Sequence, residues 1–326
     1  MLLRQALRAY STAPPTKTPV KLVAELRKLT EVSIVKAREA LAASNNDITA
    51  ALDWLNKDLV ASGAKKAAKV QDRYAGEGLI SVAVLSPGST GQGSNGLRAA
   101  MVELNCETDF VGRNDLFGEL AADVAHTAAF LSEDAQFQAF PVDALHDAPL
   151  LSARNPSTNP DPNMTVSRAI RDLISKVGEN VVLRRAVSIA QPAPAAAAER
   201  ERGQRLISYL HGSVRDPMQG RIGVVALLNM SHPGRIFASK PALEGYEKLE
   251  RALARQIAGF QTLSVRADAG DETALYQQPF MIPGELSGQP VGEALATWAR
   301  THELGDNGVE VERFAKWSVG EPIETS

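Results

Sequence analysis

The sequence contains one cysteine and five histidines, the residue types that most often supply nucleophiles, bases and metal ligands. Cys106 can act as a thiol nucleophile only beside a base, and no histidine lies near it in the sequence. A small apolar filler at the end of a strand is the other role open to it. The histidines show no metal-ligand spacing and occupy positions 126, 146, 211, 232 and 302. One cysteine also excludes an internal disulfide and a cysteine-based metal cluster.

A glycine pattern offers a second candidate for chemistry. Residues Gly91 to Gly96 read GQGSNG and match GxGxxG. A dinucleotide site needs this pattern between a strand and a helix, so that the helix N-terminus faces the phosphates. A β-rich run follows instead, which predicts a flexible loop. The sequence has no GxxxxGK[ST] pattern, so we expect no direct nucleotide binding by a P-loop.

One short segment holds an aromatic residue where a turn is expected. ELNCETDFVGRND runs from Glu103 to Asp115, beginning as a strand and ending at a helix start, and it places Phe110 between them. Burying a Phe side chain is worth roughly 1.5–3 kcal/mol, and turns are normally exposed. Phe110 must therefore fold back into the protein's own core or be buried by a partner. Since no catalytic, metal or nucleotide site emerges, contact is the use left for this ring.

Composition sets the broad class. The chain has 326 residues, of which 44% are hydrophobic and 22% charged, with a formal net charge of -3. The acidic balance argues against nucleic-acid binding. The longest apolar run, Ile222 to Leu228, is too short to span a membrane, so we expect no membrane partner. The length allows about two or three domains.

The N-terminus, residues 1–18, has the makeup of a mitochondrial presequence. Arg4 and Arg8 share a short amphipathic stretch with leucines, and no acidic residue precedes Glu25. The residues around Tyr10 resemble a matrix processing site with cleavage after that tyrosine. A frayed tail is the alternative. We therefore predict a mitochondrial matrix protein.

Residues 19–67 predict a three-helix module. Helical spacing places apolar residues on one face of each helix, and Asn46 and Asp47 are suitable N-caps for the last. Helices this short can bury their apolar faces only against each other. The lysines of Gly63–Lys69 are interpreted as a solvated face of a helical connector. The predicted stripes are Leu22, Leu26 and Leu29, then Ile34, Val35, Ala37 and Leu41, and finally Ile48, Ala51, Leu52 and Leu55.

The rest of the chain predicts two related α+β subdomains with antiparallel strands, at 68–190 and 205–326, joined by an Ala/Pro-rich linker at 191–204. Each subdomain begins with a strand, a loop, a strand and a helix, which suggests duplication. The predicted strands are 78–85, 97–105, 181–189, 205–211 and 221–230, and the predicted helices are 116–131, 166–176 and 246–260. We also expect a hairpin loop at 86–96, an irregular excursion at 132–163, and short strand pieces after residue 274, including ALYQQPFM.

Several blocks together resemble the elongation factor Ts family. KLVAELRKLTEVSIVKAREALAASNNDITAALDWL is similar to the family's ubiquitin-associated-like (UBA-like) N-terminal module. VELNCETDFVGRND resembles its Thr-Asp-Phe-Val signature, and ISKVGENVVLRRA and SYLHGS…GRIGVV resemble later blocks in the same order. The resemblance extends discontinuously from Lys21 to Gly320. With the presequence, it indicates a mitochondrial member.

The resemblance implies a guanine-nucleotide exchange factor for mitochondrial elongation factor Tu, with no catalytic chemistry and no cofactor of its own. In the family, the signature Asp and Phe enter the GTPase domain of Tu near its Mg²⁺ and phosphate site; here these are Asp109 and Phe110. The flanking Thr108 and Val111 are expected to fix the turn.

The resemblance also assigns two further contact regions. His211 and Gly212 belong to a block that faces Tu in the family, although a local hydrogen bond is the other role open to His211. The N-terminal module grips the GTPase domain, and at the start of its second helix Ile34 and Val35 present an apolar surface. The competing hypothesis is a UBA-like adaptor that binds ubiquitin-like folds or nascent chains without exchange activity.

The sequence departs from the family pattern in several places. The start of the second helix, Glu31 to Val35, lacks the usual glycines and methionines, and the segment 264–276 is too short for the helical hairpin of bacterial members. The loops 86–96, 132–163 and 213–219 are extra, and the last of them lies beside His211.

Overall fold

The computed structural model describes residues 18–30, 32–91, 93–154, 161–195, 201–213, 215–267, 270–305 and 307–323. The chain is α+β, and it divides into a compact unit ending at Lys69 and a second one beginning at Val70. Apart from Thr18, the predicted presequence lies outside the described residues. So do residues 196–200 of the predicted linker.

The first unit is built from helices α1 (Val20–Thr30), α2 (Ile34–Ala43) and α3 (Ile48–Val70). Ser33 caps α2 by accepting from the Lys36 N–H at 3.2 Å, and Asp47 accepts from the Ala50 N–H at 2.7 Å at the start of α3. The core of the unit consists of buried small and aliphatic residues: Val23, Leu26, Ala37, Ala40, Leu41, Ala51 and Leu55.

Three residues of the predicted buried stripes are exposed in this unit: Leu29, Ile34 and Val35. Leu29, predicted on the buried face of its helix, is 61% exposed because Val23 and Leu26 form the contact face instead. The segment Gly63–Lys69, predicted as a helical connector, is confirmed as helical and forms the last part of α3, which ends at Val70. Good helix formers such as Ala and Lys carry it onward without a break.

The second unit contains antiparallel strands in the order β3-β4-β2-β1-β5-β7-β8, with β6 on the edge of β1. Strands β1 and β5 meet at one pair only, Gly88 and Arg205. Gly88 permits this approach, because a Cβ there would lie 2.2 Å from the Gln204 carbonyl oxygen. The bounds of the strands are β1 Glu77–Thr90, β2 Gly93–Cys106, β3 Gln138–Ala139, β4 Val181–Gln191, β5 Arg202–His211, β6 Gln219–Gly220, β7 Ile222–Ser231 and β8 Val309–Ser318.

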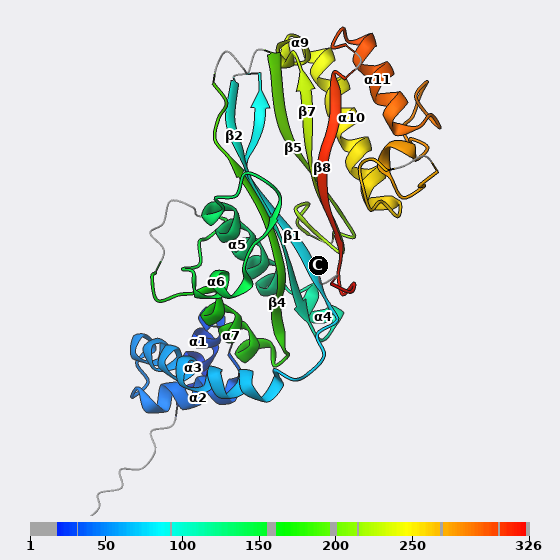
Figure 1. The fold of residues 1–326 in the computed structure, drawn as a ribbon. Coiled ribbons are helices and arrows are strands. Elements are labelled where there is room, and N and C mark those ends of the chain that lie inside the picture. The colour runs from blue at the N-terminus through cyan, green and yellow to red at the C-terminus, as the bar shows by residue number, and fades with distance from the viewer. Residues whose placement is uncertain are drawn as a thin grey trace, which may run out of the picture. The chain divides into compact units, whose positions relative to one another are not determined.

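These strands form two sheets that pack face to face, with helices outside each (Figure 1). Alternate residues of β1, β2 and β4 meet alternate residues of β5 and β7 in one core, because side chains in a strand point to opposite faces in turn. Helix α5 covers the outer face of β1 and β2, and α10 and α11 cover the outer face of the second sheet. The helix bounds are α4 Asp109–Gly112, α5 Asp115–Leu131, α6 Val142–Asp147, α7 Val166–Val177, α9 Pro233–Phe237, α10 Lys240–Gly259, η1 Leu275–Gln277 and α11 Val291–Thr301.

The two halves of this unit repeat one order of elements. The first runs β1, β2, α5, α7, β4, and the second runs β5, β7, α10, α11, β8. In both, the initial hairpin is followed by its covering helix, and a later helix leads into the strand that pairs with the hairpin's second strand. With the short elements α4, β3, α6, β6, α9 and η1 left out, the order is the one expected for the duplication, which stays a prediction.

Three local predictions were wrong. The proposed hairpin loop at 86–96 is mostly strand, so the GxGxxG pattern lies at a β-hairpin turn and in the start of β2. ALYQQPFM contains the 3-10 helix η1 instead of a strand, and α11 follows it unpredicted. The excursion 132–163 includes β3 and α6.

Candidate partner-binding site

Phe110 lies on a short helical turn directly after β2. Thr108 begins α4 as its N-cap, with its Oγ1 accepting from the Val111 N–H at 3.4 Å. Consecutive positions on a helix point about 100° apart. Val111 is accordingly buried, at 9% exposure, whereas Phe110 is 82% exposed. Phe110 does not fold back into the core of the protein.

The base of this turn is anchored by a residue far away in the sequence. Glu179 accepts from the Thr108 N–H at 3.0 Å and from its Oγ1 at 2.7 Å. Gly178, in the left-handed conformation with φ 78°, ends α7 and places Glu179 for these bonds. The next residue, Asn180, donates to the carbonyl oxygens of Gln71 and Arg73 at 3.2 and 2.8 Å. The turn is therefore held from its base while Phe110 stays exposed.

Cys106 supports the same turn and is not activated. Its Sγ donates to the Thr108 carbonyl oxygen at 3.2 Å, and the side chain is fully buried. Burial, together with the negative charge of Glu179, raises the pKa of the Cys106 thiol to about 12. A thiolate is the reactive form, so this environment disfavours nucleophilic chemistry and fits the filler role.

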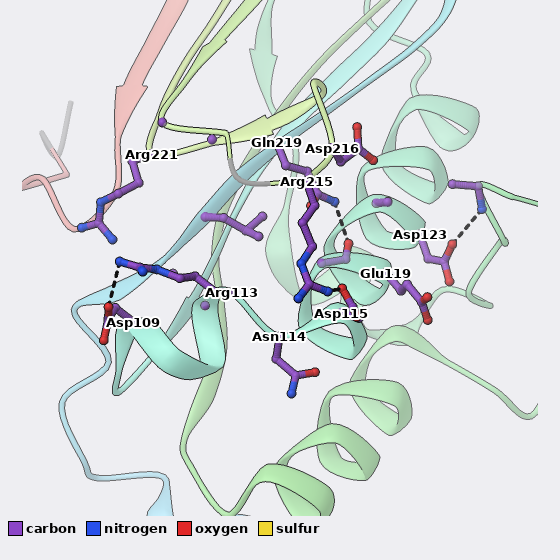
Figure 2. A pocket seen from close by; sticks show the side chains of 18 of the residues that line it. Asp109, Arg113, Asn114, Asp115, Glu119, Asp123, Arg215, Asp216, Gln219 and Arg221 are labelled. Atoms are coloured by element: carbon purple, nitrogen blue, oxygen red, sulfur yellow. Dashed lines mark hydrogen bonds and ion pairs between the residues drawn. The ribbon is translucent and has the colours of Figure 1, made fainter. Parts of the chain in front are cut away.

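Asp109, beside Phe110, is half exposed. Its carboxylate pairs with Arg113 at 2.9 Å across one turn (Figure 2). The Arg113 side chain is 65% exposed, so this ion pair is weak and can exchange for a partner's groups at little cost.

A cavity of about 470 Å³ lies beside the turn and brings distant segments together. Asp109 and the start of α5 form one wall, and the loop after β5, including Gly212, forms another (Figure 2). Burial raises the pKa of Asp123 within this cavity, although the Ala153 N–H donates to it at 2.7 Å. The charged residues of the lining are Asp109, Arg113, Asp115, Glu119, Asp123, Arg154, Arg215, Asp216 and Arg221.

The remaining predicted residues are exposed. The His211 Nδ1 lies 3.4 Å from the Tyr209 hydroxyl, so His211 has a local contact while its side chain faces solvent. Gly212 has φ 75°, a conformation that favours glycine, and it lines the cavity with Asp109. In the first unit, Ile34 and Val35 open α2 with exposures of 47% and 67%.

Sequence reasoning missed Glu179 and Gln219. Glu179 lies in the block ISKVGENVVLRRA, which carries the family resemblance, and a polar residue directly after a helix-ending glycine was the available signal. Gln219 belongs to an extra loop with no such signal. Its side chain reaches the start of α5, as described below.

Within the ranges described above, no group of three or more His, Cys, Asp and Glu side chains could hold a metal ion. No helix of this described part is long and apolar enough to cross a membrane.

The chain matches the family described as Elongation factor TS over residues 107–279, from the start of the Phe110 turn to the segment after η1. It is 55% identical to the mitochondrial elongation factor Ts of Coprinopsis cinerea, covering 98% of this chain and 97% of that protein. The chain belongs to the elongation factor Ts family.

Other relatives extend the likeness. The mitochondrial elongation factor Ts of Laccaria bicolor is 53% identical, covering 98% of this chain and 96% of that protein. A third relative, the mitochondrial elongation factor Ts 2 of Postia placenta, is 45% identical, covering 97% of this chain and 96% of that protein. As a mitochondrial elongation factor Ts family member, the chain is a translation elongation factor located in mitochondria, and its family implies elongation factor Tu as partner.

Proposed function

We propose that the protein binds mitochondrial elongation factor Tu in the matrix and promotes release of GDP, by inserting Phe110 and Asp109 near the Mg²⁺ and phosphate site of the GTPase. Family membership supports the reaction, and the relatives' names support the compartment. Phe110 carries the proposal as an exposed aromatic on an anchored turn.

The anchoring favours this use of the ring. Burying Phe110 in a partner is worth roughly 1.5–3 kcal/mol. A mobile loop would lose part of that gain in becoming ordered, whereas a turn held by Glu179 and Cys106 is already in place. The side chain of Phe110 can therefore act as a wedge.

The wedge promotes release through linkage. If insertion requires the phosphate-binding loop of Tu to shift, the factor binds nucleotide-free Tu better than the GDP-bound form. GDP then lowers the affinity of Tu for the factor, and the factor lowers the affinity of Tu for GDP by the same ratio. A typical coupling free energy of about 1–3 kcal/mol lowers the affinity for GDP by about 5–150-fold. A strong exchange factor therefore needs several such contacts.

Other exposed residues supply candidates for those contacts. We assign Asp109 a competing polar contact near the phosphate site, and His211 and Gly212 a second contact beside the same cavity. Ile34 and Val35 are assigned to the grip of the N-terminal module on the GTPase domain. Thr108 and Val111 serve as supports of the turn, since one caps it and the other is buried beneath it.

The test is release of labelled GDP from mitochondrial elongation factor Tu. Wild-type protein should accelerate release, and Phe110→Ala should reduce the acceleration by about ten-fold or more, the equivalent of the roughly 1.5–3 kcal/mol of lost burial. Phe130→Ala is the matched control, because Phe130 is also exposed, at 58%, but lies at the far end of α5. The control should exchange like wild type.

Two results would count against this function. Equal, unstimulated release with wild type and Phe110→Ala would end the exchange hypothesis. Binding to Tu without any stimulated release would favour an adaptor role instead. For the matrix assignment, protein recovered from mitochondria should begin near Ser11 if cleavage follows Tyr10, and an intact Met1 would contradict it.

A further inference from the structure

The loop between β5 and β7 crosses from the second half of the core to the first. Its segment 215–220 leaves the β5–β7 pair and adds β6 to the edge of β1, where Gly220 pairs with Ile80. The Val82 N–H donates to the Met218 carbonyl oxygen at 2.9 Å. Asp216 fixes the turn before β6 by accepting from the Met218 N–H at 2.8 Å. The segment is thus a defined structure attached to the first sheet.

From this position the segment holds the first turns of α5. The Gln219 Nε2 donates to the Gly118 carbonyl oxygen at 2.7 Å in a half-buried setting, and Arg215 forms an ion pair with Asp115 (Figure 2). Gly118 makes room for Gln219, because a Cβ at Gly118 would lie 2.9 Å from the Gln219 Oε1. The ion pair is exposed and contributes little, so Gln219 provides the main contact.

The start of α5 is in turn coupled to the turn that carries Phe110. Two residues separate α4 from α5, and both are bonded back to α4. The Arg113 N–H donates to the Asp109 carbonyl oxygen at 3.1 Å, and the Asn114 N–H donates to that of Val111 at 2.9 Å. The Gly118 N–H in turn donates to the Asn114 carbonyl oxygen at 3.0 Å. A shift of the α5 start therefore moves the Phe110 turn.

We propose that Gln219 is a positioning residue for Phe110, through Gly118 and the α4–α5 junction, with Arg215 in a minor role. This inference rests on the exchange function proposed above. Glu179 holds the turn from one side, and Gln219 holds the adjoining helix from the other. The extra loop beside His211 thus acts within the protein, by aiming the wedge.

The test compares Gln219→Met with wild type in labelled-GDP release from mitochondrial elongation factor Tu. Methionine keeps the length of the side chain but cannot donate to Gly118. The maximal release rate should fall about five-fold, because Phe110 is correctly oriented in fewer of the complexes. The half-saturating concentration of the factor should change less than about two-fold, because the rest of the contact surface still binds Tu. Gln219→Lys restores a donor and should recover most of the rate.

The matched control is Gln204→Met. Gln204 is also half-buried, on the opposite end of β5, where its Nε2 donates to Asn229 Oδ1 and Glu312 Oε2, both at 3.1 Å. Gln204→Met should lose about as much stability as Gln219→Met, but it should keep the wild-type maximal rate of GDP release.

Amide hydrogen exchange of the full-length protein gives a readout independent of Tu. Amides of residues 110–118 should exchange faster in Gln219→Met than in wild type, and those of β7 should not change. Unchanged protection at 110–118, or an unchanged maximal rate while Phe110→Ala loses it, overturns the positioning role and leaves the exchange function standing. Wild-type protein that fails to stimulate release overturns both.

Discussion

Glu179 and Thr108, 71 residues apart in sequence, are joined by two hydrogen bonds, from the Thr108 N–H at 3.0 Å and from its Oγ1 at 2.7 Å. The same hydroxyl caps α4 through the Val111 N–H. One side chain thus connects the end of β2, the end of α7 and the turn that presents Phe110. Rigidity at this point is what makes an exposed ring useful as a wedge.

Thr108→Val should lower both stability and exchange. The variant loses an N-cap and a bond to Glu179, which together should cost about 1–2 kcal/mol in the free energy of unfolding, measured by urea denaturation. Because the turn becomes less defined, stimulated GDP release should fall about five-fold or more.

Thr165→Val separates these two effects. Thr165 is the N-cap of α7 and accepts from the Arg168 N–H at 3.3 Å, away from the Phe110 turn. A similar stability loss of about 1 kcal/mol is expected, with wild-type exchange. If both variants lost exchange equally, the defect would reflect stability alone and the specific role of Thr108 would be wrong.

Glu103 forms the most deeply buried ion-pair network among the described residues. Its carboxylate is fully buried and lies 3.0 Å from Arg184 and 2.6 Å from Arg185. It also accepts from the Gly320 N–H at 2.8 Å, so the C-terminal end of β8 is connected to β2 and β4. The carboxylate lies between the two sheets, three residues before Cys106.

Glu103→Ala should be severely destabilising. Arg184 would lose its carboxylate partner and Arg185 would keep only the partly exposed Glu321. Removing one partner of a buried pair typically costs about 3–5 kcal/mol. Urea denaturation measures the loss. Lys240→Ala is the control, because it breaks an exposed pair with Glu244 and should change stability by less than about 1 kcal/mol. Loss of less than about 1 kcal/mol for Glu103→Ala would contradict the network's structural role.

Much of the core could be predicted because local patterns agree with the fold. The strand and helix of ELNCETDFVGRND follow from a β-rich run and from Asn114, whose side chain accepts from the Leu116 N–H at 2.9 Å as a helix cap. The repeated order of elements was also visible, since each half places its hydrophobic strands and helix in the same succession. Phe110 stood out because its residue type conflicts with its turn.

The rest depends on contacts that the sequence does not announce. Glu179 anchors Thr108 only once α7 and β2 end side by side, and β6 forms because β1 offers a free edge to the extra loop. The strand pairing that fills 86–96 overrode a run of turn residues, including Gly88 and Gly96, which adopt positive φ values within the hairpin. Helix α11 was missed because its stripe of Leu295 and Trp298 follows an irregular, proline-rich stretch.

Glu250 gives the fold a pH dependence. It lies on α10 beneath the second sheet, with its Oε1 2.7 Å from the Arg205 Nε. Burial raises the pKa of Glu250 from the ordinary 4.5 to about 7, although Arg205 opposes the shift. Burial and the nearby Glu250 charge also raise the pKa of Tyr246, one turn away.

The sign of the effect follows from which state holds the proton. Between pH 4.5 and about 7 the folded protein keeps Glu250 protonated while the unfolded chain releases that proton. Raising the pH through this window therefore lowers the free energy of unfolding, by up to about 3 kcal/mol for a shift of this size. Above about pH 7 the contribution of Glu250 to the free energy of unfolding no longer changes with pH.

Glu250→Gln should remove this dependence, since an amide does not titrate. Urea denaturation of both proteins from pH 4.5 to 8 should show wild type losing stability relative to the variant up to about pH 7, with a constant difference above it. Glu244→Gln is the control, because it removes a 56%-exposed carboxylate that lies on the same helix but does not contribute to the pKa shift of Glu250, and it should run parallel to wild type. Parallel profiles for Glu250→Gln and wild type would show that this carboxyl group is not protonated by burial in the folded state.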